Sequence, residues 1–390
     1  MTRPFTAAEL SAPVSQLPPA AYFDDALLRR ERELLFAKDG PGYAGHALMV
    51  PNLGDYAVLA TRNNAQALTR TRSAEGAEGE TAGVNLISNI CRHRQAMMLD
   101  GRGSLKGNGG NVVCPLHRWT YSGEGELIGA PHFPCNPALN LANRTLKSWN
   151  GLLFDGPRDP VVDLAKLSTQ TRQTLDFSGY VFDRAVTHDC NYNWKTFVEV
   201  YLEDYHVGPF HPGLGQFVTC DDLAWEWGNE FSVQTVGLSR GFDKPGSATY
   251  KRWHDQVVQF RRGVPPPHGA IWLTYYPNIT IEWYPHTLVV SSLWPQAVDK
   301  TINVVEFYYA EEVALFEREF IEAQQAAYME TCVEDDEIAL RMDAGRKALF
   351  NEGRVEVGPY QSPMEDGMQH FHEWYRGKLA GPQLNGPLNR

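Results

Sequence analysis

The chain has 390 residues, 43% of them hydrophobic and 21% charged, and a formal net charge of -12 at pH 7. One ordinary hydrophobic core does not support this length, so the sequence predicts at least two domains. Because general nucleic-acid binders need a basic face for phosphates, the acidic balance argues against a nucleic-acid partner. The amino terminus lacks the apolar core of a signal peptide and no run approaches a membrane span, so we expect no membrane contact and a cytoplasmic location.

Sequence patterns divide the chain into three segments. Residues 1–40 combine a proline-rich start with an amphipathic stretch that ends at Asp39-Gly40-Pro41, which predicts a helical segment followed by a turn. Residues 41–160 consist of short apolar runs cut by glycine and asparagine, which is typical of a small all-β domain. Residues 161–390 return to a mixture of helix and strand patterns.

The third segment predicts an antiparallel sheet and a long helix. Aromatic and β-branched strands follow one another from about residue 270 to residue 310, with no long helix between them. An amphipathic helix, or a pair of helices, is expected from Glu311 to about Phe350. We therefore expect an α+β chain.

Two of the six cysteines lie next to histidines, in loops of the predicted β domain. Cys91 is followed by His93, and Cys114 is followed by His117. A structural zinc site is one interpretation, but zinc sites usually group cysteine with cysteine and histidine with histidine. One thiolate and one imidazole in each loop instead favour a binuclear cluster, in which one iron binds both thiolates and the other both imidazoles. This Rieske-type [2Fe-2S] cluster relays single electrons, so the sequence predicts a second site that receives them.

The segment NWKTFVEVYLEDYHVGPFHP, residues 193–212, offers the first ligands of such a site. An unbroken helix would place His206 and His211 on different faces. We expect Gly208 and Pro209 to break the helix, so that the second histidine turns back toward the first. One carboxylate would complete a two-histidine, one-carboxylate face, which leaves positions on ferrous iron open for dioxygen and substrate.

Four consecutive acidic residues, Glu334 to Glu337, lie near the middle of the predicted long helix and are candidates for this carboxylate. Helical periodicity does not separate Asp335 from Asp336, because each shares a face with apolar residues. An exposed acidic turn without a metal is the alternative interpretation.

The chain resembles the α (oxygenase) subunits of the Rieske non-haem iron oxygenases, also called aromatic ring-hydroxylating oxygenases. The resemblance extends from YAGHALMVPNLGDY through both cysteine–histidine loops and GELIGAPHF to the two-histidine segment and the acidic helix. It implies an all-β Rieske domain at residues 41–160 and a helix-grip (START/Bet v1-like) catalytic domain at 161–390. Residues 1–40 would be a helical segment that packs on the catalytic domain.

The resemblance also implies two metal centres. The ligands of the [2Fe-2S] cluster would be Cys91, His93, Cys114 and His117. The ligands of a mononuclear Fe(II) would be His206, His211 and Asp335, with Asp336 as the near alternative.

Glu203 lies where the family carries an acid that hydrogen-bonds across a subunit boundary to a cluster histidine. A metal-bound histidine commonly donates its second N–H to a carboxylate, which supports this role; a solvated glutamate is the alternative. In this family the two metals of one chain lie too far apart for rapid electron transfer. The resemblance therefore implies a homotrimer by head-to-tail packing, to which a small β subunit could be added.

The implied activity is that of the oxygenase component of a multicomponent enzyme. Electrons from NAD(P)H would arrive through a separate flavin reductase, a ferredoxin or both, and O2 would hydroxylate or oxidatively demethylate an aromatic or other small substrate. A Rieske-type electron-transfer protein without oxygenase activity is the alternative. An aromatic pocket would suit an arene or, through cation–π attraction, a quaternary ammonium compound. The predicted pocket wall consists of Phe197, Val198, Tyr201, Leu202, Phe217, Trp283 and Trp294.

The cluster loops depart from the family pattern at Gln95 and Arg118, where glycine is common, and this puts the local backbone of both loops in question. Together with Arg92 and Arg94, Arg118 forms a basic patch on an acidic chain. This patch could guide an acidic ferredoxin or a reductase to the cluster. The alternative is that these arginines serve local packing and hydrogen bonding.

Overall fold

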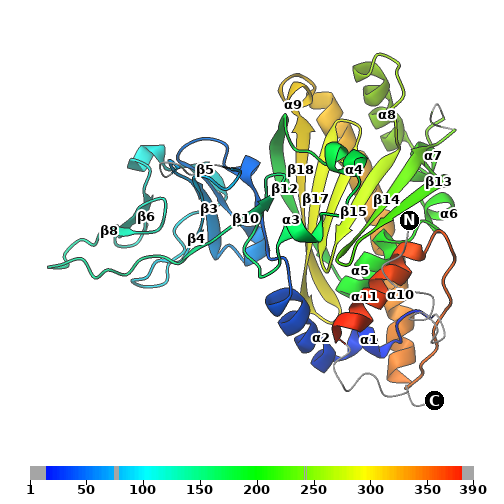
Figure 1. Cartoon of the computed structure of the whole chain (residues 1–390), viewed down its shortest axis with the longest axis horizontal. Helices are drawn as coiled ribbons and strands as arrows, with labels where there is room; N and C mark the ends of the chain where they lie inside the picture. The colour runs from blue at the N-terminus through cyan, green and yellow to red at the C-terminus, as the bar shows by residue number, and fades with distance from the viewer. Residues whose placement is uncertain (1–14, 74–78, 241, 243, 380–390) are drawn as a thin grey trace. The chain divides into compact units, whose positions relative to one another are not determined.

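A computed structural model describes residues 15–73, 79–240, 242 and 244–379, and Figure 1 shows the course of the chain. The chain divides into two compact units. One unit comprises Met1–Gly40 together with Asp163–Arg390, and the other comprises Pro41–Val162. Within the described part of the chain, none of the helices combines the length and the apolar character that crossing a bilayer demands.

The unit at 41–162 is built from short antiparallel strands. They form a five-stranded sheet of order β5-β2-β3-β4-β9 and two three-stranded sheets of order β1-β11-β10 and β6-β7-β8. The strands are β1 (Tyr43–His46), β2 (Asp55–Val58), β3 (Gln66–Arg70), β4 (Val84–Ser88), β5 (Arg102–Ser104), β6 (Val112–Val113), β7 (Thr120–Tyr121), β8 (Leu127–Gly129), β9 (Asn143–Arg144), β10 (Lys147–Trp149) and β11 (Leu152–Phe154). Short 3₁₀ turns follow three of them: η2 (Ala47–Met49), η3 (Ala60–Arg62) and η4 (Leu105–Asn108).

The larger unit contains a seven-stranded antiparallel sheet of order β12-β18-β17-β16-β15-β14-β13. Its strands are β12 (Tyr180–Cys190), β13 (Val218–Trp227), β14 (Phe231–Leu238), β15 (Ala270–Tyr275), β16 (Ile279–Tyr284), β17 (Thr287–Ala297) and β18 (Lys300–Ala310). Its helices are α1 (Ala20–Phe23), α2 (Asp25–Glu31), the π-helix η1 (Arg32–Lys38), α4 (Thr169–Thr174), α5 (Trp194–Tyr201), α6 (Val207–Phe210), α7 (Leu214–Phe217), α8 (Ala248–Phe260), α9 (Glu311–Phe316), α10 (Arg318–Asn351) and α11 (Asp366–Leu379). The short helix α3 (Pro160–Asp163) spans the boundary between the two units.

The long helix α10 packs on one face of this sheet. Alternate side chains of a strand point to the same face, and on β18 the buried Val305, Phe307 and Tyr309 belong to a core that also contains Phe320 and Ala327 of α10. The predicted α+β fold with an antiparallel sheet and a helix-grip arrangement is confirmed. Of the two outcomes expected from Glu311 to about Phe350, one helix or a pair, the structure has the pair, α9 and α10, with Glu317 between them.

The amino-terminal segment packs on the larger unit through a buried ion pair. Asp24 caps α2, because its side chain accepts hydrogen bonds from two backbone N–H groups of the first turn. At the end of α2 the fully buried Glu31 accepts hydrogen bonds from Lys195 Nζ at 2.7 Å and from Trp194 Nε1 at 2.8 Å. A third donor to Glu31 is the Tyr375 hydroxyl of α11. This network joins α2, α5 and α11.

Candidate active site and metal centres

Two loops with the same backbone pattern present the predicted cluster ligands of the smaller unit. The N–H groups of Cys91 and Cys114 each donate to the carbonyl group five residues later, at 2.9 and 2.8 Å. The N–H groups of Gln95 and Arg118 each donate back to the cysteine carbonyl four residues earlier, at 3.1 Å. Each loop is therefore a tight turn closed by two hydrogen bonds, with its cysteine at the start.

The two positions where glycine was expected have left-handed backbones. The φ angle is 55° at Gln95 and 61° at Arg118. A residue with a Cβ atom adopts this conformation at a cost of roughly 1–2 kcal/mol, whereas glycine adopts it freely. The turn therefore explains why glycine is common at both positions, and this chain keeps the turn in spite of the strain.

The two thiols of the loops lie side by side in the core of the unit. Cys91 and Cys114 are buried, form no disulfide and lie within hydrogen-bonding reach of each other. The Tyr121 hydroxyl lies 3.6 Å from Cys91 Sγ. Although burial opposes it, hydrogen bonds from the His93 backbone N–H and from Tyr121 hold the pKa of Cys91 below its usual value. Burial and the neighbouring Cys91 raise the pKa of Cys114, so the chain alone favours one thiolate of the two, and the thiolate is the form that binds metal.

The two imidazoles also lie side by side. The ring centroids of His93 and His117 are 4.7 Å apart, and His93 stacks on the buried Trp119 at 4.9 Å. The His93 Nδ1 atom is buried and has no hydrogen-bond partner among the described residues. Thiols therefore pair with thiols and imidazoles with imidazoles, an arrangement that fits a cluster with two sulfur ligands on one iron and two nitrogen ligands on the other.

In the larger unit, His206 and His211 lie at the two ends of the one-turn helix α6. The prediction that Gly208 and Pro209 break the helix between the histidines is wrong, because both residues are part of α6. Proline is tolerated there since the first turn of a helix does not need its missing N–H. The helical segment is interrupted earlier, after Leu202, where α5 has ended.

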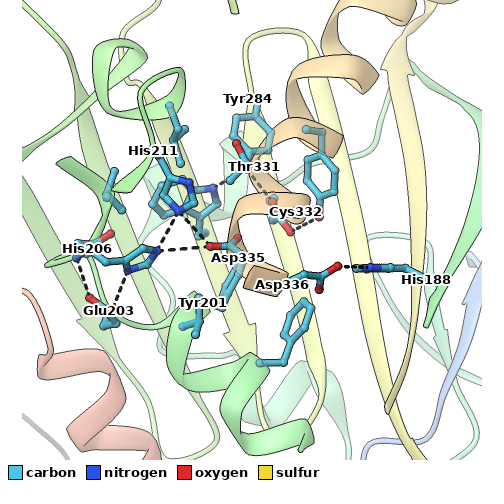
Figure 2. Close-up of a pocket in the computed structure, with 18 of the residues that line it drawn as sticks. His188, Tyr201, Glu203, His206, His211, Tyr284, Thr331, Cys332, Asp335 and Asp336 are labelled. Carbon is cyan, nitrogen blue, oxygen red and sulfur yellow. Dashed lines mark hydrogen bonds and ion pairs between the residues drawn. The ribbon is translucent and has the colours of Figure 1, made fainter. Parts of the chain in front are cut away.

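Three side chains of this unit converge on one point, as Figure 2 shows. His206 Nε2 and His211 Nε2 are 3.0 Å apart. Asp335 Oδ1 lies 3.0 Å from His211 Nε2 and 3.4 Å from His206 Nε2. Ligands about 2.1 Å from a metal and at right angles to one another are separated by about 3 Å, so these distances suit one face of an octahedral ion.

The outer nitrogens of both histidines face carboxylates. His206 Nδ1 lies 2.6 Å from Glu203 Oε1, and His211 Nδ1 lies 2.7 Å from Glu334 Oε2. A carboxylate at Nδ1 holds the proton there and leaves the Nε2 lone pair free for a metal. The role of Glu334 was missed from the sequence, because nothing in the run of four acids distinguishes it.

These contacts indicate that a cation belongs between the three inner atoms. Two lone pairs and a carboxylate oxygen that face one another repel unless a proton or a metal lies between them. Although burial opposes it, Asp335 and Glu203 raise the pKa of His206 to about 10, and the pKa of His211 is also raised. The chain alone would therefore hold protons at this point, and a divalent metal can replace them.

The structure also separates the two adjacent aspartates of α10. Asp336 points away from the histidine pair, and its Oδ2 lies 2.8 Å from His188 Nε2 (Figure 2). Its Oδ1 accepts a hydrogen bond from the Tyr192 hydroxyl at 2.7 Å. Asp335, and not Asp336, thus lies with His206 and His211.

A pocket lies beside the three converging side chains and is rich in aromatic and acidic groups. Its 22 lining residues include eight aromatic side chains and five carboxylates. The part of the chain that the structure describes contributes no lysine or arginine to this lining. The carboxylates are Glu203, Asp204, Glu282, Asp335 and Asp336, and the aromatic residues are Tyr192, Phe197, Tyr201, Tyr250, Trp253, Trp272, Tyr284 and Tyr328.

Most of the predicted pocket wall is wrong. Only Phe197 and Tyr201 line the pocket. Val198 and Leu202 are core residues, and Phe217 stacks on Trp253 at 4.3 Å. The two remaining tryptophans, Trp283 and Trp294, do not line this pocket. Closeness in sequence to the histidines did not determine which side chains face the pocket.

Two buried acids of the pocket were not expected. Asp204 is 2% exposed, and its Oδ2 has no hydrogen-bond partner among the described residues. Glu282 is also 2% exposed and lies within β16. In the strand sequence ITIEWY, alternation assigns Glu282 to the polar face, which normally means solvent. Here the polar face is the wall of a pocket.

Comparisons with known proteins agree with this geometry. Residues 177–381 match the model of the ring hydroxylating alpha subunit (catalytic domain), and residues 54–149 match that of the Rieske [2Fe-2S] domain. The chain is 61% identical over 371 residues to putrescine 2-hydroxylase of Ralstonia nicotianae, covering 95% of this chain and 97% of the relative. It is 58% identical over 373 residues to putrescine 2-hydroxylase of Bordetella bronchiseptica, covering 93% and 84%. The crystal structure of the quaternary ammonium Rieske monooxygenase CntA in complex with L-carnitine has the same fold, with a TM-score of 0.70 at 17% identity over 97% of this chain and 99% of that chain.

Proposed function

Because the chain belongs to the family of Rieske ring-hydroxylating oxygenase alpha subunits, we propose that it hydroxylates putrescine or a similar short aliphatic diamine. The observation that carries this proposal is the pair of buried pocket carboxylates Asp204 and Glu282, which form no ion pair with a described histidine, lysine or arginine. The other three pocket carboxylates, Glu203, Asp335 and Asp336, face histidines. Such a wall attracts a cationic substrate and rejects an anionic one. The 61% identity to a putrescine 2-hydroxylase supports the same substrate class.

Membership of the family confirms the predicted [2Fe-2S] cluster and mononuclear iron. The zinc-site and electron-carrier interpretations are therefore wrong. We assign the cluster to Cys91, His93, Cys114 and His117, and the iron to His206, His211 and Asp335. When bound, the iron supplies the activation of dioxygen.

The overall reaction consumes one dioxygen molecule, two electrons and two protons, and converts one C–H bond into a C–OH group while one water molecule forms. The chain contributes binding and orientation. Glu203 and Glu334 hold the histidine rings with their Nε2 atoms turned inward. The aromatic side chains of the pocket pack around the aliphatic part of the substrate and exclude water from it.

The proposal includes the electron path. Residues 41–160 form the Rieske domain and residues 161–390 the catalytic domain, with the segment 1–40 attached to the latter. Electrons from NAD(P)H reach the cluster through a separate flavin reductase or ferredoxin in the cytoplasm. Glu203, which already contacts His206, joins the iron site to the cluster of a neighbouring subunit in a head-to-tail homotrimer. A small β subunit is an optional addition to this trimer.

The cluster loops carry the proposed docking site for the electron donor. Arg92, Arg94 and Arg118 are all exposed. Complementary charge chiefly raises association rates, so Arg118→Glu is expected to slow reductase-coupled turnover most strongly at low salt. Unchanged turnover and unchanged salt dependence would remove the docking role.

The proposed reaction is tested with the purified oxygenase, a Rieske-oxygenase reductase, NADH and ¹⁸O-labelled dioxygen. With putrescine we expect a monohydroxylated diamine that carries one labelled oxygen atom, identified by mass spectrometry. Parallel reactions contain L-carnitine, choline or naphthalene. Turnover of one of these compounds without turnover of putrescine would contradict the proposal.

A further inference from the structure

Glu282 occupies an unusual position for a charged side chain. It lies in the middle of the sheet, where its cross-strand neighbours are Trp272 on β15 and Val289 on β17. Its side chain is on the face that packs against α10, among buried aromatic residues. A carboxylate is rarely buried in such surroundings unless it is paired, because it loses its hydration.

Among the described residues, the donors to the Glu282 carboxylate are all neutral. Tyr284 Oη donates to its Oε2 at 2.8 Å, and Tyr328 Oη donates to its Oε1 at 3.1 Å. Thr280 Oγ1 adds a longer contact to Oε1 at 3.3 Å. Tyr284 in turn accepts a hydrogen bond from Trp272 Nε1 at 3.0 Å, which fixes the phenol. An ionised carboxylate has about four acceptor positions, so these three donors leave room for one more.

Among the described residues, no basic side chain forms an ion pair with this carboxylate. Burial raises the pKa of Glu282 to about 7, against the hydrogen bonds from Tyr284, Tyr328 and Thr280, and Asp335 raises it further. A bound cation would remove this penalty, because a buried charge is stable when it is paired and hydrogen-bonded. Trp253 and Trp272 line the same pocket, and aromatic rings of this kind attract cations.

Glu282 of β16 lines the same pocket as the proposed iron ligands His206, His211 and Asp335. Tyr328, which holds Glu282, lies seven residues before Asp335 on α10, a separation of about 10 Å along the helix axis. Both residues line the pocket, so a ligand bound at Glu282 extends toward the metal ligands. Binding a charged group at one end of a flexible chain restricts which of its carbons lie near the metal ligands.

We propose that the Glu282 carboxylate binds one ammonium group of the diamine and thereby sets the preference for a diamine over a monoamine. This inference rests on the proposed function and adds the residue that carries its specificity. Tyr284 and Tyr328 are positioning residues, because they act through the carboxylate. Tyr284 reaches into the pocket beside α10 (Figure 2).

The test uses Glu282→Gln, which keeps the shape and removes the charge. Binding is measured by calorimetry on the holoenzyme without oxygen, so that no turnover interferes, with putrescine and 1-butylamine as ligands. We expect the Kd for putrescine to rise roughly 10- to 100-fold, as for the loss of a charge-assisted hydrogen bond. The preference for putrescine over 1-butylamine should fall toward one. An unchanged putrescine Kd in a folded Glu282→Gln protein would overturn the inference.

A matched control is available on the opposite face of the sheet. Glu306 of β18 is 2% exposed and accepts a hydrogen bond at 2.6 Å from Tyr308, two residues later, just as Glu282 does from Tyr284. Glu306 does not line the pocket, so Glu306→Gln should leave the putrescine Kd unchanged. If Glu306→Gln weakens putrescine binding as strongly as Glu282→Gln does, removal of any buried charge has this effect and the inference fails.

Two further measurements separate the possible failures. Glu282→Asp keeps the charge but shortens the side chain, so it should retain the preference for the diamine with a smaller loss of affinity; loss of that preference would contradict the inference. Thermal melting and the visible spectrum of the cluster show whether Glu282→Gln folds. If it does not fold, Glu282→Asp takes its place in the binding test. If the wild-type enzyme itself neither binds nor hydroxylates putrescine, the proposed function fails, whatever the variants do.

Discussion

Replacing Glu282 with glutamine should make the substrate-free protein more stable at neutral and alkaline pH. The side chain is 2% exposed, and burial raises its pKa to about 7 from the ordinary glutamate value of 4.5. In the unfolded chain the carboxyl group ionises near pH 4.5, whereas in the folded chain it keeps its proton until about pH 7. The unfolding free energy therefore decreases as the pH rises between these two values, and the full decrease is reached above pH 7.

The size of the penalty follows from the two pKa values. Their difference corresponds to about 3 kcal/mol of unfolding free energy. Glutamine cannot ionise, so Glu282→Gln should remove this amount at pH 8 and change little at pH 4.5. For a unit of this size we expect a rise in Tm on the order of 5–10 °C at pH 8.

The assay is thermal melting of wild type, Glu282→Gln and Glu306→Gln, followed by circular dichroism at pH 5 and pH 8. The difference in Tm between wild type and Glu282→Gln should increase from pH 5 to pH 8. Saturating putrescine should reduce this difference at pH 8, since an ammonium ion then neutralises the carboxylate. An equal gap at both pH values, or a Glu282→Gln protein less stable than wild type at pH 8, would refute the reasoning.

Three other perturbations test separate parts of the account. Gln95→Gly and Arg118→Gly should each stabilise the smaller unit by about 1 kcal/mol, because both residues have left-handed backbones; equal or lower melting temperatures would contradict the strain. Lys195→Met should lower the unfolding free energy by about 3–5 kcal/mol, because it leaves the buried Glu31 carboxylate without its ion-pair partner. Urea titration measures this change, and a negligible change would contradict the role of the ion pair. His206→Ala should lose the mononuclear iron while the visible spectrum of the cluster persists. Glu334→Gln should weaken iron binding roughly 10- to 100-fold. Iron is measured after dialysis against a chelator, and a full iron content in both variants would contradict the roles of these residues.

The sequence predicted the elements of the fold and the groups that converge, because spacing carries that information. A cysteine–histidine pair in each of two loops, and two histidines close together, are local patterns. They do not depend on how distant segments pack. The turns at Gln95 and Arg118 could be inferred for the same reason, since a position that usually holds glycine indicates a left-handed backbone.

The pocket could not be predicted in this way, because distant segments form it. Asp335 and Asp336 are adjacent in the sequence, and only the folded chain shows that the second lies beside His188 of β12. Strand alternation places Glu282 on a polar face, but it does not say that a helix covers that face. Phe217 was expected in the pocket wall and lies instead in the core on Trp253, because its direction depends on tertiary packing.

The most direct test of the central claim is a competition between substrates. Wild-type oxygenase receives reductase, NADH, ¹⁸O-labelled dioxygen and an equimolar mixture of putrescine, 1-butylamine and L-carnitine, and all products are measured by mass spectrometry. The acid-lined pocket predicts that labelled hydroxyputrescine is the dominant product. Preferential oxidation of 1-butylamine or L-carnitine would contradict the claim that this pocket selects a diamine.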